Sequence, residues 1–166
     1  MNKTMRSLAV VGLLGVPAVL AVPVAAKVIS GDSSADVLRG TKNADTIRGH
    51  DGRDRIYGRS GRDRLFGGAK DDRIHGGTAA DMIEGGTGED LVTGATGNDR
   101  LFGGSGKDRI EGGKGRDRID GGKDNDTILA RDGTRDTIRC GTGKKDSVIA
   151  DARDDVAGDC ETVKRP

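Results

Sequence analysis

The chain has 166 residues and a formal net charge of +1, with 29 glycines, no tryptophan and a hydrophobic fraction of 33%. This length allows one domain, and this composition excludes a conventional globular core of large apolar side chains. The balanced charge excludes a strong bulk preference for nucleic acid or for an acidic partner.

Residues 1–26 have the three parts of a secretory signal peptide. Lys3 and Arg6 form a basic start, residues 8–20 are an apolar run, and Val24 and Ala26 fit the small-residue rule of a cleavage site. We therefore expect cleavage after Ala26 and a secreted, extracellular protein. The alternative is a membrane anchor, but the run is short for a spanning helix and has no basic stop-transfer flank. No cysteine follows the run, so lipid attachment is not expected there, and no membrane span is expected after cleavage.

A nine-residue repeat follows a lead-in segment, residues 27–35, and continues through residues 36–129. Two registers run without interruption, and eleven consecutive matches in each exclude an accident of composition. The first register is aspartate, at Asp36, Asp45, Asp54, Asp63, Asp72, Asp81, Asp90, Asp99, Asp108, Asp117 and Asp126. The second, two places later, is aliphatic, at Leu38, Ile47, Ile56, Leu65, Ile74, Ile83, Val92, Leu101, Ile110, Ile119 and Ile128.

Each unit predicts a short strand followed by a tight turn. The aliphatic residue lies between polar neighbours, as in Arg109-Ile110-Glu111, which indicates a three-residue strand with one inward side chain. The preceding residues, typified by Gly103–Asp108 (GGSGKD), are rich in glycine, which supplies the positive φ of tight turns. We expect two units per revolution of a coil, so that residue i lies beside residue i+18.

This coil would stack the aspartates in two columns, one on each edge. Asp54, Asp72, Asp90, Asp108 and Asp126 would form one column, and Asp45, Asp63, Asp81, Asp99 and Asp117 the other. Stacked carboxylates repel, and a hard divalent cation removes the repulsion. Calcium takes six to eight oxygen ligands, which carboxylates and unhindered turn carbonyls can supply. The alternative is that aspartate only caps the turns, but a capping position would also accept Asn, Ser or Thr.

The pattern GGxGxDxUx, where U is a large aliphatic residue, resembles the RTX, or hemolysin-type, calcium-binding nonapeptide family. The resemblance covers residues 36–129 well and residues 130–155 loosely. It implies an all-β fold, a right-handed parallel β-roll or β-solenoid with two nonapeptide repeats per turn. It also implies several calcium ions between turns i and i+18, held by the aspartates from Asp45 to Asp126 and by turn carbonyls.

The turns differ from one another, which predicts stronger and weaker sites. Basic residues precede the aspartate at Arg53, Arg62, Lys107 and Arg116, whereas arrays of the family are usually acidic. The fourth-position glycine is replaced in four turns, by Asn43, Lys70, Ala79 and Asp124. We expect the tightest sites at Asp90 with Asp108 and at Asp99 with Asp117, with turn glycines Gly86, Gly88, Gly97, Gly104, Gly106, Gly113 and Gly115 contributing.

Residues 130–166 predict irregular repeats and a C-terminal cap. The spacing lengthens to ten residues at Asp136 and Asp146, which loosens the coil as a terminal repeat should. Cys140 and Cys160 are the two cysteines, and an even number in an exported chain favours a disulfide over two free thiols. Closing this loop would contribute about 3 kcal/mol by chain entropy.

Outward arginines predict a second surface feature. Arg55, Arg73 and Arg109 should share one face, and Arg64, Arg100 and Arg118 the other, with Phe66 and Phe102 beside the second set. The simpler interpretation is a solvated face with cross-strand pairs such as Arg100 with Glu84. The alternative is a face that binds an anionic surface polymer.

No catalytic signature accompanies the repeats. HExxH is absent, Gly58–Gly61 (GRSG) lacks a glycine of the GxSxG elbow, and His50 and His75 are isolated and expected in solvent. We predict a secreted, non-enzymatic calcium-binding β-roll in which metal binding is coupled to folding. The alternative is a metal-independent structural solenoid or adhesin that binds anionic polymers, and no specific nucleic-acid partner is expected.

Overall fold

A computed structural model describes residues 25–166; residues 1–24, which hold most of the predicted signal peptide, lie outside the described part. The described chain is built from sixteen β-strands joined by turns. It contains no helix of the length and hydropathy needed to cross a membrane. The all-β fold predicted from the repeat is confirmed.

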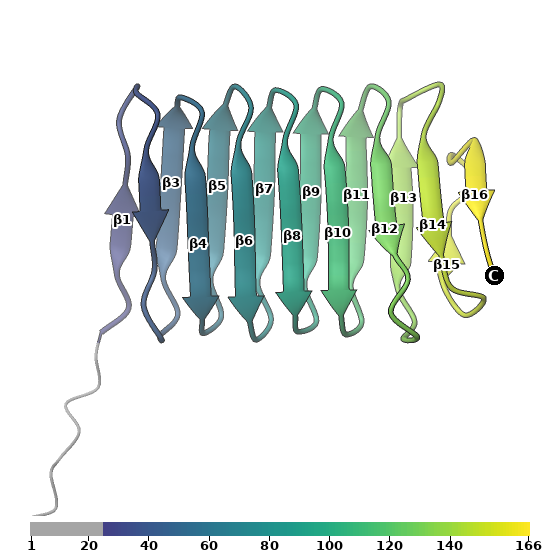
Figure 1. Ribbon diagram of the computed structural model, residues 1–166, viewed down its shortest axis with the longest axis horizontal. Coiled ribbons are helices and arrows are strands. Elements are labelled where there is room, and N and C mark those ends of the chain that lie inside the picture. The colour runs from purple at the N-terminus through teal and green to yellow at the C-terminus, as the bar shows by residue number, and fades with distance from the viewer. Residues whose placement is uncertain (1–24) are drawn as a thin grey trace, which may run out of the picture.

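The strands form two parallel sheets that face each other across a narrow core (Figure 1). One sheet holds the odd-numbered strands: β1 (Val28–Ser30), β3 (Thr46–Asp51), β5 (Arg64–Ala69), β7 (Met82–Thr87), β9 (Arg100–Ser105), β11 (Arg118–Lys123), β13 (Thr137–Gly141) and β15 (Asp155–Val156). The other holds the even-numbered strands: β2 (Val37–Arg39), β4 (Arg55–Ser60), β6 (Arg73–Thr78), β8 (Leu91–Thr96), β10 (Arg109–Lys114), β12 (Thr127–Ala130), β14 (Ser147–Ala150) and β16 (Thr162–Lys164).

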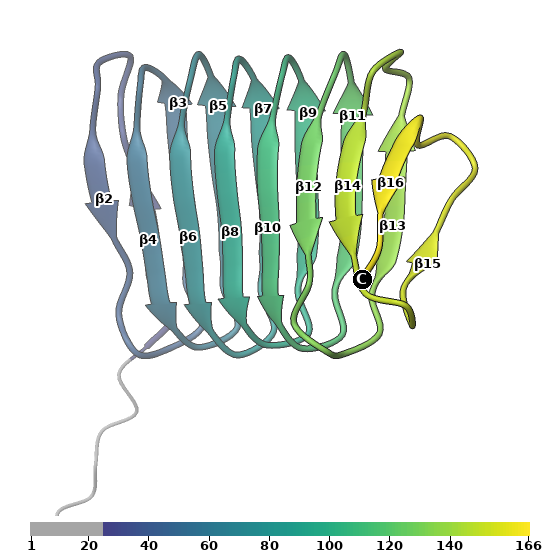
Figure 2. The same ribbon diagram turned by 45° about the vertical axis from the view of Figure 1, so that its right-hand side comes forward.

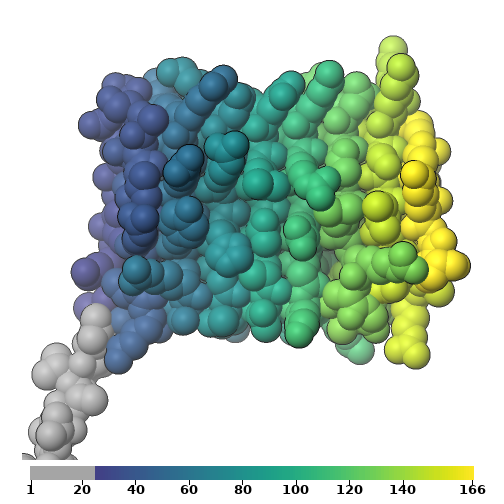
Figure 3. Space-filling model, in the orientation of Figure 1, coloured from purple at the N-terminus to yellow at the C-terminus, as the bar shows by residue number. Residues whose placement is uncertain are grey.

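The chain alternates between the sheets as it advances, so two repeats make one turn of a right-handed coil. In Figure 1 the nearer, even-numbered strands run downward, the odd-numbered strands behind them run upward, and the coil progresses from left to right. In the space-filling view the rungs follow one another as bands from purple to yellow (Figure 3). The register confirms the predicted neighbour at i+18, since Ile47 pairs with Leu65 and Leu65 pairs with Ile83.

The core is one file of aliphatic side chains from each sheet. From β3 to β14 each strand contributes one buried aliphatic residue, and the residues on either side of it face outward. Together the two files comprise Ile47, Ile56, Leu65, Ile74, Ile83, Val92, Leu101, Ile110, Ile119, Ile128, Ile138 and Val148. Ala130, Cys140 and Ala150 add a second buried side chain in β12, β13 and β14.

The strands are longer than the sequence predicts. From β3 to β11 each has six residues, where we expected three. The difference arises because the inward alternation continues past the aliphatic residue to a buried glycine, as at Leu65 and Gly67 in β5. An inward glycine adds no apolar side chain, so the hydrophobic pattern of β5 ends at Leu65, four residues before the strand ends at Ala69.

The two ends of the coil differ (Figure 2). At the N-terminal end, β1 lies in the segment predicted as a lead-in and pairs with β3, so the coil starts before the regular repeat. Val28 and Val37 are 75% and 48% exposed there. At the C-terminal end the strand offset lengthens to 19 residues at Arg118–Thr137 and to 20 at Thr127–Ser147. The predicted disulfide joins Cys140 to Cys160 and ties the last rung to β13.

Candidate metal sites

The repeat aspartates stack in two columns, as the spacing predicts. The turns that follow odd-numbered strands form the upper edge in Figure 1, and those that follow even-numbered strands form the lower edge. The upper-edge aspartates are Asp54, Asp72, Asp90, Asp108, Asp126 and Asp146, and the lower-edge aspartates are Asp45, Asp63, Asp81, Asp99, Asp117 and Asp136. Each is at most 3% exposed, so the two columns lie inside the coil and not on its surface.

One oxygen of each carboxylate belongs to a continuous ladder of hydrogen bonds. The amide of Asp72 donates to Oδ1 of Asp90, and the amide of Asp90 donates to Oδ1 of Asp108, at 2.8 and 2.9 Å. The lower edge repeats the arrangement. It begins where the amide of Lys27 donates to Oδ1 of Asp45, and the amide of Asp45 donates in turn to Oδ1 of Asp63. The sequence did not predict this ladder. It gives the repeat aspartates a structural role, which the alternative that they only cap the turns anticipates in part.

The ladder also continues beyond the predicted ligand set. Asp136 and Asp146 accept the amides of Asp117 and Asp126, both at distances under 3 Å. Asp154 and Glu161 then end the lower and upper columns by accepting the amides of Asp136 and Asp146. The ten-residue spacing was the available signal for Asp136 and Asp146, whereas no periodicity indicates Glu161.

The second oxygen of the same carboxylates has no partner. Oδ2 is buried without any hydrogen bond in eleven aspartates: Asp54, Asp63, Asp72, Asp81, Asp90, Asp99, Asp108, Asp117, Asp126, Asp136 and Asp146. A buried ionised oxygen without a partner is costly, so a regular series of them calls for a compensating positive charge or for protonation.

The first glycine of each turn leaves room for this oxygen. A Cβ added to Gly85 would lie 2.5 Å from Oδ2 of Asp90 and 2.5 Å from the carbonyl oxygen of Gly103. Gly94 has the same relation, at the same distances, to Asp99 and Gly112 on the lower edge. Our expectation that these glycines serve positive φ is wrong at this position, because neither has a positive φ. The space is filled by a carboxylate oxygen and a backbone carbonyl that point into the same interior.

The second and fourth turn positions do need positive φ. Gly86 and Gly88 have φ of 119° and 135°, and an added Cβ on Gly104 or Gly106 would meet their carbonyl oxygens. The stacked turns therefore bring carbonyls close to the following turn, as the predicted role of these glycines requires.

Turns without the fourth-position glycine have a different backbone. Lys70, Ala79 and Asp124 have φ between 73° and 81°, whereas fourth-position glycines from Gly52 to Gly115 have φ between 102° and 152°. Asn43 is not in the positive-φ region. Since φ sets the direction of the neighbouring peptide groups, the turns fall into two positive-φ classes, with the Asn43 turn outside both. Only the turns at residues 85–90 and 103–108 occupy consecutive rungs of one edge with glycine at both the second and the fourth position.

Burial changes the acidity of the ladder. Removal from water raises the pKa of Asp72, Asp81, Asp108 and Asp117, each to about 7, against the opposing effect of the ladder hydrogen bond. Neighbouring carboxylates of the same column add to the rise. At Asp45 burial also favours the neutral form, but hydrogen bonds from Lys27 and Thr41 outweigh it and lower the pKa.

This donor set fits calcium. Every available group is oxygen, either a carboxylate with one free atom or a turn carbonyl, and hard cations with six to eight ligands prefer such sets. Zinc and copper sites would need histidine or thiolate, which the two edges do not present among their buried residues. The assignment of individual ligands, from Asp45 to Asp126 with the turn glycines, stays a prediction.

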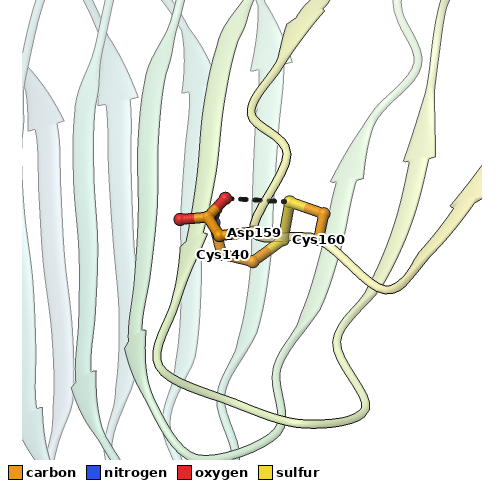
Figure 4. Close-up of side chains that lie close together, drawn as sticks. All are labelled: Cys140, Asp159 and Cys160. Atoms are coloured by element: carbon orange, nitrogen blue, oxygen red, sulfur yellow. Dashed lines mark hydrogen bonds between the residues drawn. A yellow bond between two sulfur atoms is a disulfide. The ribbon is translucent and has the colours of Figure 1, made fainter.

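A third cluster of potential ligands is not a metal site. Cys140, Asp159 and Cys160 lie together near the C-terminal cap (Figure 4). The two sulfurs are joined in the disulfide, and Asp159 accepts the amides of Cys140 and Gly141 at 3.3 and 3.1 Å. The cluster therefore fastens the cap.

The outer faces agree with the predicted arginine pattern but not with the predicted pairs. Arg55 and Arg73 pair in register on the even-numbered sheet, and Arg100 and Arg118 on the odd-numbered sheet. The expected pair of Arg100 with Glu84 is absent, since the single ion pair within residues 25–166 joins Arg53 to Asp71. Arg100 lies beside Met82 in register, and Glu84 is two residues further along that strand. His75 is exposed as expected.

Comparison with known proteins agrees with the site. The family model described as "RTX calcium-binding nonapeptide repeat" matches the chain four times, at residues 30–65, 57–92, 66–101 and 93–128, which together span more than half of the chain. No curated protein matches the chain.

Proposed function

Because the chain belongs to the family of the RTX calcium-binding nonapeptide repeat, we propose that it is an exported, non-enzymatic calcium-binding β-roll whose folding depends on calcium. The observation that carries this proposal is the series of eleven buried Oδ2 atoms without a partner. They lie in two columns next to inward carbonyl oxygens, and this arrangement supports the proposal of successive calcium sites along each edge.

Each residue class has a separate task at such a site. Oδ1 holds the preceding rung through its amide, which fixes the carboxylate and leaves Oδ2 free. The first glycine leaves room for the carboxylate Oδ2 and for the carbonyl of the next rung, and the second and fourth glycines set the direction of the carbonyls. Bound calcium would supply the positive charge that lets neighbouring carboxylates of one column stay ionised together.

Coupling to folding follows from the cost of the empty array. Without a cation, each rung buries carboxylate oxygens that have no partner, while it orders many glycines that lose much conformational freedom. Each occupied site adds about 2.7 kcal/mol when calcium exceeds its dissociation constant a hundredfold. Several such sites are enough to shift a marginal array toward the folded state.

Export and the absence of catalysis are the remaining parts of the proposal. Residues 1–26 have the pattern of a signal peptide, and the Cys140–Cys160 disulfide suits an oxidising compartment. The ladder carboxylates each hold a backbone amide, so they are committed to the stack and are poorly placed to act on a substrate.

The test uses a substitution that distinguishes the role of Oδ1 in the ladder from the proposed role of Oδ2 at the metal. Asp108→Asn keeps an acceptor for the amide of Asp90 but removes the charge, and Asp120→Asn on the outer side of β11 removes the same charge outside the ladder. Calorimetric titration should show loss of about one site, or calcium affinity at least about tenfold weaker, in Asp108→Asn only. Circular dichroism should show strand content that disappears in chelator and returns with calcium.

A different outcome would favour the metal-independent solenoid. If both variants bind calcium like the unchanged protein, the ladder is purely structural. A strand-rich spectrum with a sharp thermal transition in excess chelator would separately remove the coupling of calcium to folding.

A further inference from the structure

The lower edge carries a basic groove that calcium binding does not explain. Two hollows of about 620 and 500 Å³ lie along this edge and adjoin at Asn98 and Arg100, which line both; we call them together the lower-edge groove. The second hollow is lined by four arginines, Arg100, Arg116, Arg118 and Arg135. The first adds Arg62 and Arg64.

These arginines are exposed and have no ion-pair partner in the part of the chain that the structure describes. The acidic residues that line the second hollow, Asp99 and Asp117, are at most 2% exposed and direct Oδ1 to a backbone amide. The groove therefore offers free guanidinium groups to solvent, whereas the carboxylates beneath them are buried and bind backbone amides through Oδ1.

The two edges carry similar numbers of basic residues but differ in the acids that accompany them. In the lower-edge turns and strand starts, residues 41–46, 59–64, 77–82, 95–100, 113–118 and 131–137, ten basic residues stand against one acid outside the ladder, Asp132. In the corresponding upper-edge segments, residues 32–37, 50–55, 68–73, 86–91, 104–109, 122–127 and 142–147, nine basic residues stand against five such acids. The overall amino-acid composition does not predict this difference in acidic residues between the two edges.

We propose that the lower-edge groove binds a linear phosphodiester polymer through its phosphates. Arg100 and Arg118 pair in register on adjacent strands, about 4.8 Å apart at the backbone, which is an unfavourable arrangement of like charges unless an anion bridges them. A phosphodiester has two free oxygens, and guanidinium groups bind such oxygens in bidentate geometry. A polymer lying along the second hollow would meet an arginine at three successive rungs, at Arg100, Arg118 and Arg135.

The groove favours a polymer without bases. Proteins that bind single-stranded nucleic acid stack bases on aromatic rings. No aromatic side chain lines either of the two hollows, and Phe102 lies beside the groove on the face of the odd-numbered sheet. This partner goes beyond calcium binding, and the arginines that would bind it are separate from the proposed calcium ligands.

The test compares matched double variants of the calcium-loaded full chain. Arg116→Gln with Arg118→Gln changes the lower edge, and Lys107→Gln with Arg109→Gln changes the same repeat positions on the upper edge. Fluorescence anisotropy with end-labelled poly(glycerol phosphate) should show binding weakened about tenfold in the first variant and less than about twofold in the second. The slope of log affinity against log salt should fall by about 0.7 for each phosphate that the variant no longer neutralises.

Three results would overturn the proposal. Equal losses of affinity in both variants would mean that binding is bulk electrostatics, and unchanged affinity in both would mean that the groove is not the site. Single-stranded DNA bound more than about tenfold tighter than the base-free polymer would mean that bases are read. Calcium titration and circular dichroism of the same variants separate these results from misfolding and from a failure of the calcium proposal.

Discussion

The upper and lower edges of the coil share an interior and differ in their exteriors. Inside, both columns carry the same aspartate ladder, with amide-to-carboxylate distances from 2.7 to 2.9 Å between Asp45 and Asp126. Outside, the upper edge mixes charges and contains the ion pair Arg53–Asp71, whereas the lower edge is almost uniformly basic. With two repeats per turn, alternate repeats face different edges. One repeat pattern can therefore hold the metal sites while two sets of variable positions diverge.

The largest expected effect tests whether the aspartate columns of the upper and lower edges behave alike. The pKa of Asp72 and Asp108 on the upper edge, and of Asp81 and Asp117 on the lower edge, is raised from 3.8 to about 7 in the folded protein. A raised folded-state pKa stabilises the fold fully below the unfolded pKa, and this contribution is lost as pH rises from about 4 to 7. Calcium-free protein should therefore gain strand content on acidification, with Tm about 10 °C or more higher at pH 5 than at pH 8.

Calcium-loaded protein should show the opposite trend, because protons compete with the metal for the same carboxylates. The measurement is thermal unfolding by circular dichroism in chelator and in excess calcium. Asp108→Asn and Asp117→Asn should flatten the calcium-free pH dependence to a similar extent. A flattening confined to one of them would show that the two columns are not equivalent.

The next effect concerns the first turn glycine. Gly85→Ala on the upper edge and Gly94→Ala on the lower edge would each place a methyl group against a carbonyl and a ladder carboxylate. We expect each to lower the free energy of unfolding in calcium by about 3 kcal/mol, at the upper end of overpacking costs. Chemical denaturation measures it. Gly158→Ala, whose added Cβ would meet nothing within 4 Å and whose φ is not positive, controls for the loss of a glycine. A different loss of unfolding free energy in Gly85→Ala and Gly94→Ala would show that the interiors of the two edges are not equivalent.

A smaller effect sharpens the distinction between turn classes. Lys70→Gly on the upper edge and Ala79→Gly on the lower edge would release residues held at φ of 73° and 81°. Both should tighten calcium binding, by about threefold, because the turn can adopt the φ of the glycine class and redirect its carbonyls. Calorimetry on each variant tests this. Tighter binding at only one edge would indicate that surface charge, not turn geometry, limits the weaker sites.

The smallest effect isolates the surface charge. Arg116→Asn on the lower edge removes a positive charge next to Asp117, and Lys107→Asn does so next to Asp108. We expect calcium affinity to rise about twofold in each, as for exposed charges in solvent, and more in Arg116→Asn because its surroundings contain fewer acids. The comparison requires titration at low ionic strength, where screening is weak. An unchanged or weaker affinity in Arg116→Asn would contradict this expectation.

The sequence determines the coil more completely than it determines the site. Two registers at a spacing of nine predicted the sheets, the i+18 pairing and the two columns, and the even cysteine count predicted the disulfide. Strand length was underestimated because an inward glycine such as Gly67 looks like part of a turn. The ladder was missed because a carboxylate bonded to an amide eighteen residues away leaves no local signal. The expected pair of Arg100 with Glu84 is absent because the register places Met82 beside Arg100, and Glu84 lies two residues further along that strand.

The ladder has one further property, which is that it is directional. Every bond runs from the amide of one rung to the carboxylate of a rung that comes later in the chain, usually eighteen residues later. A chain that emerges N-terminus first, from a ribosome or through a membrane, therefore always ends in an open rung whose acceptor has not yet emerged. Completion waits for Asp154 and Glu161, which supply the last acceptors of the two columns. We therefore expect the rungs of a chain that emerges in this direction to be completed in chain order, the last two by Asp154 and Glu161.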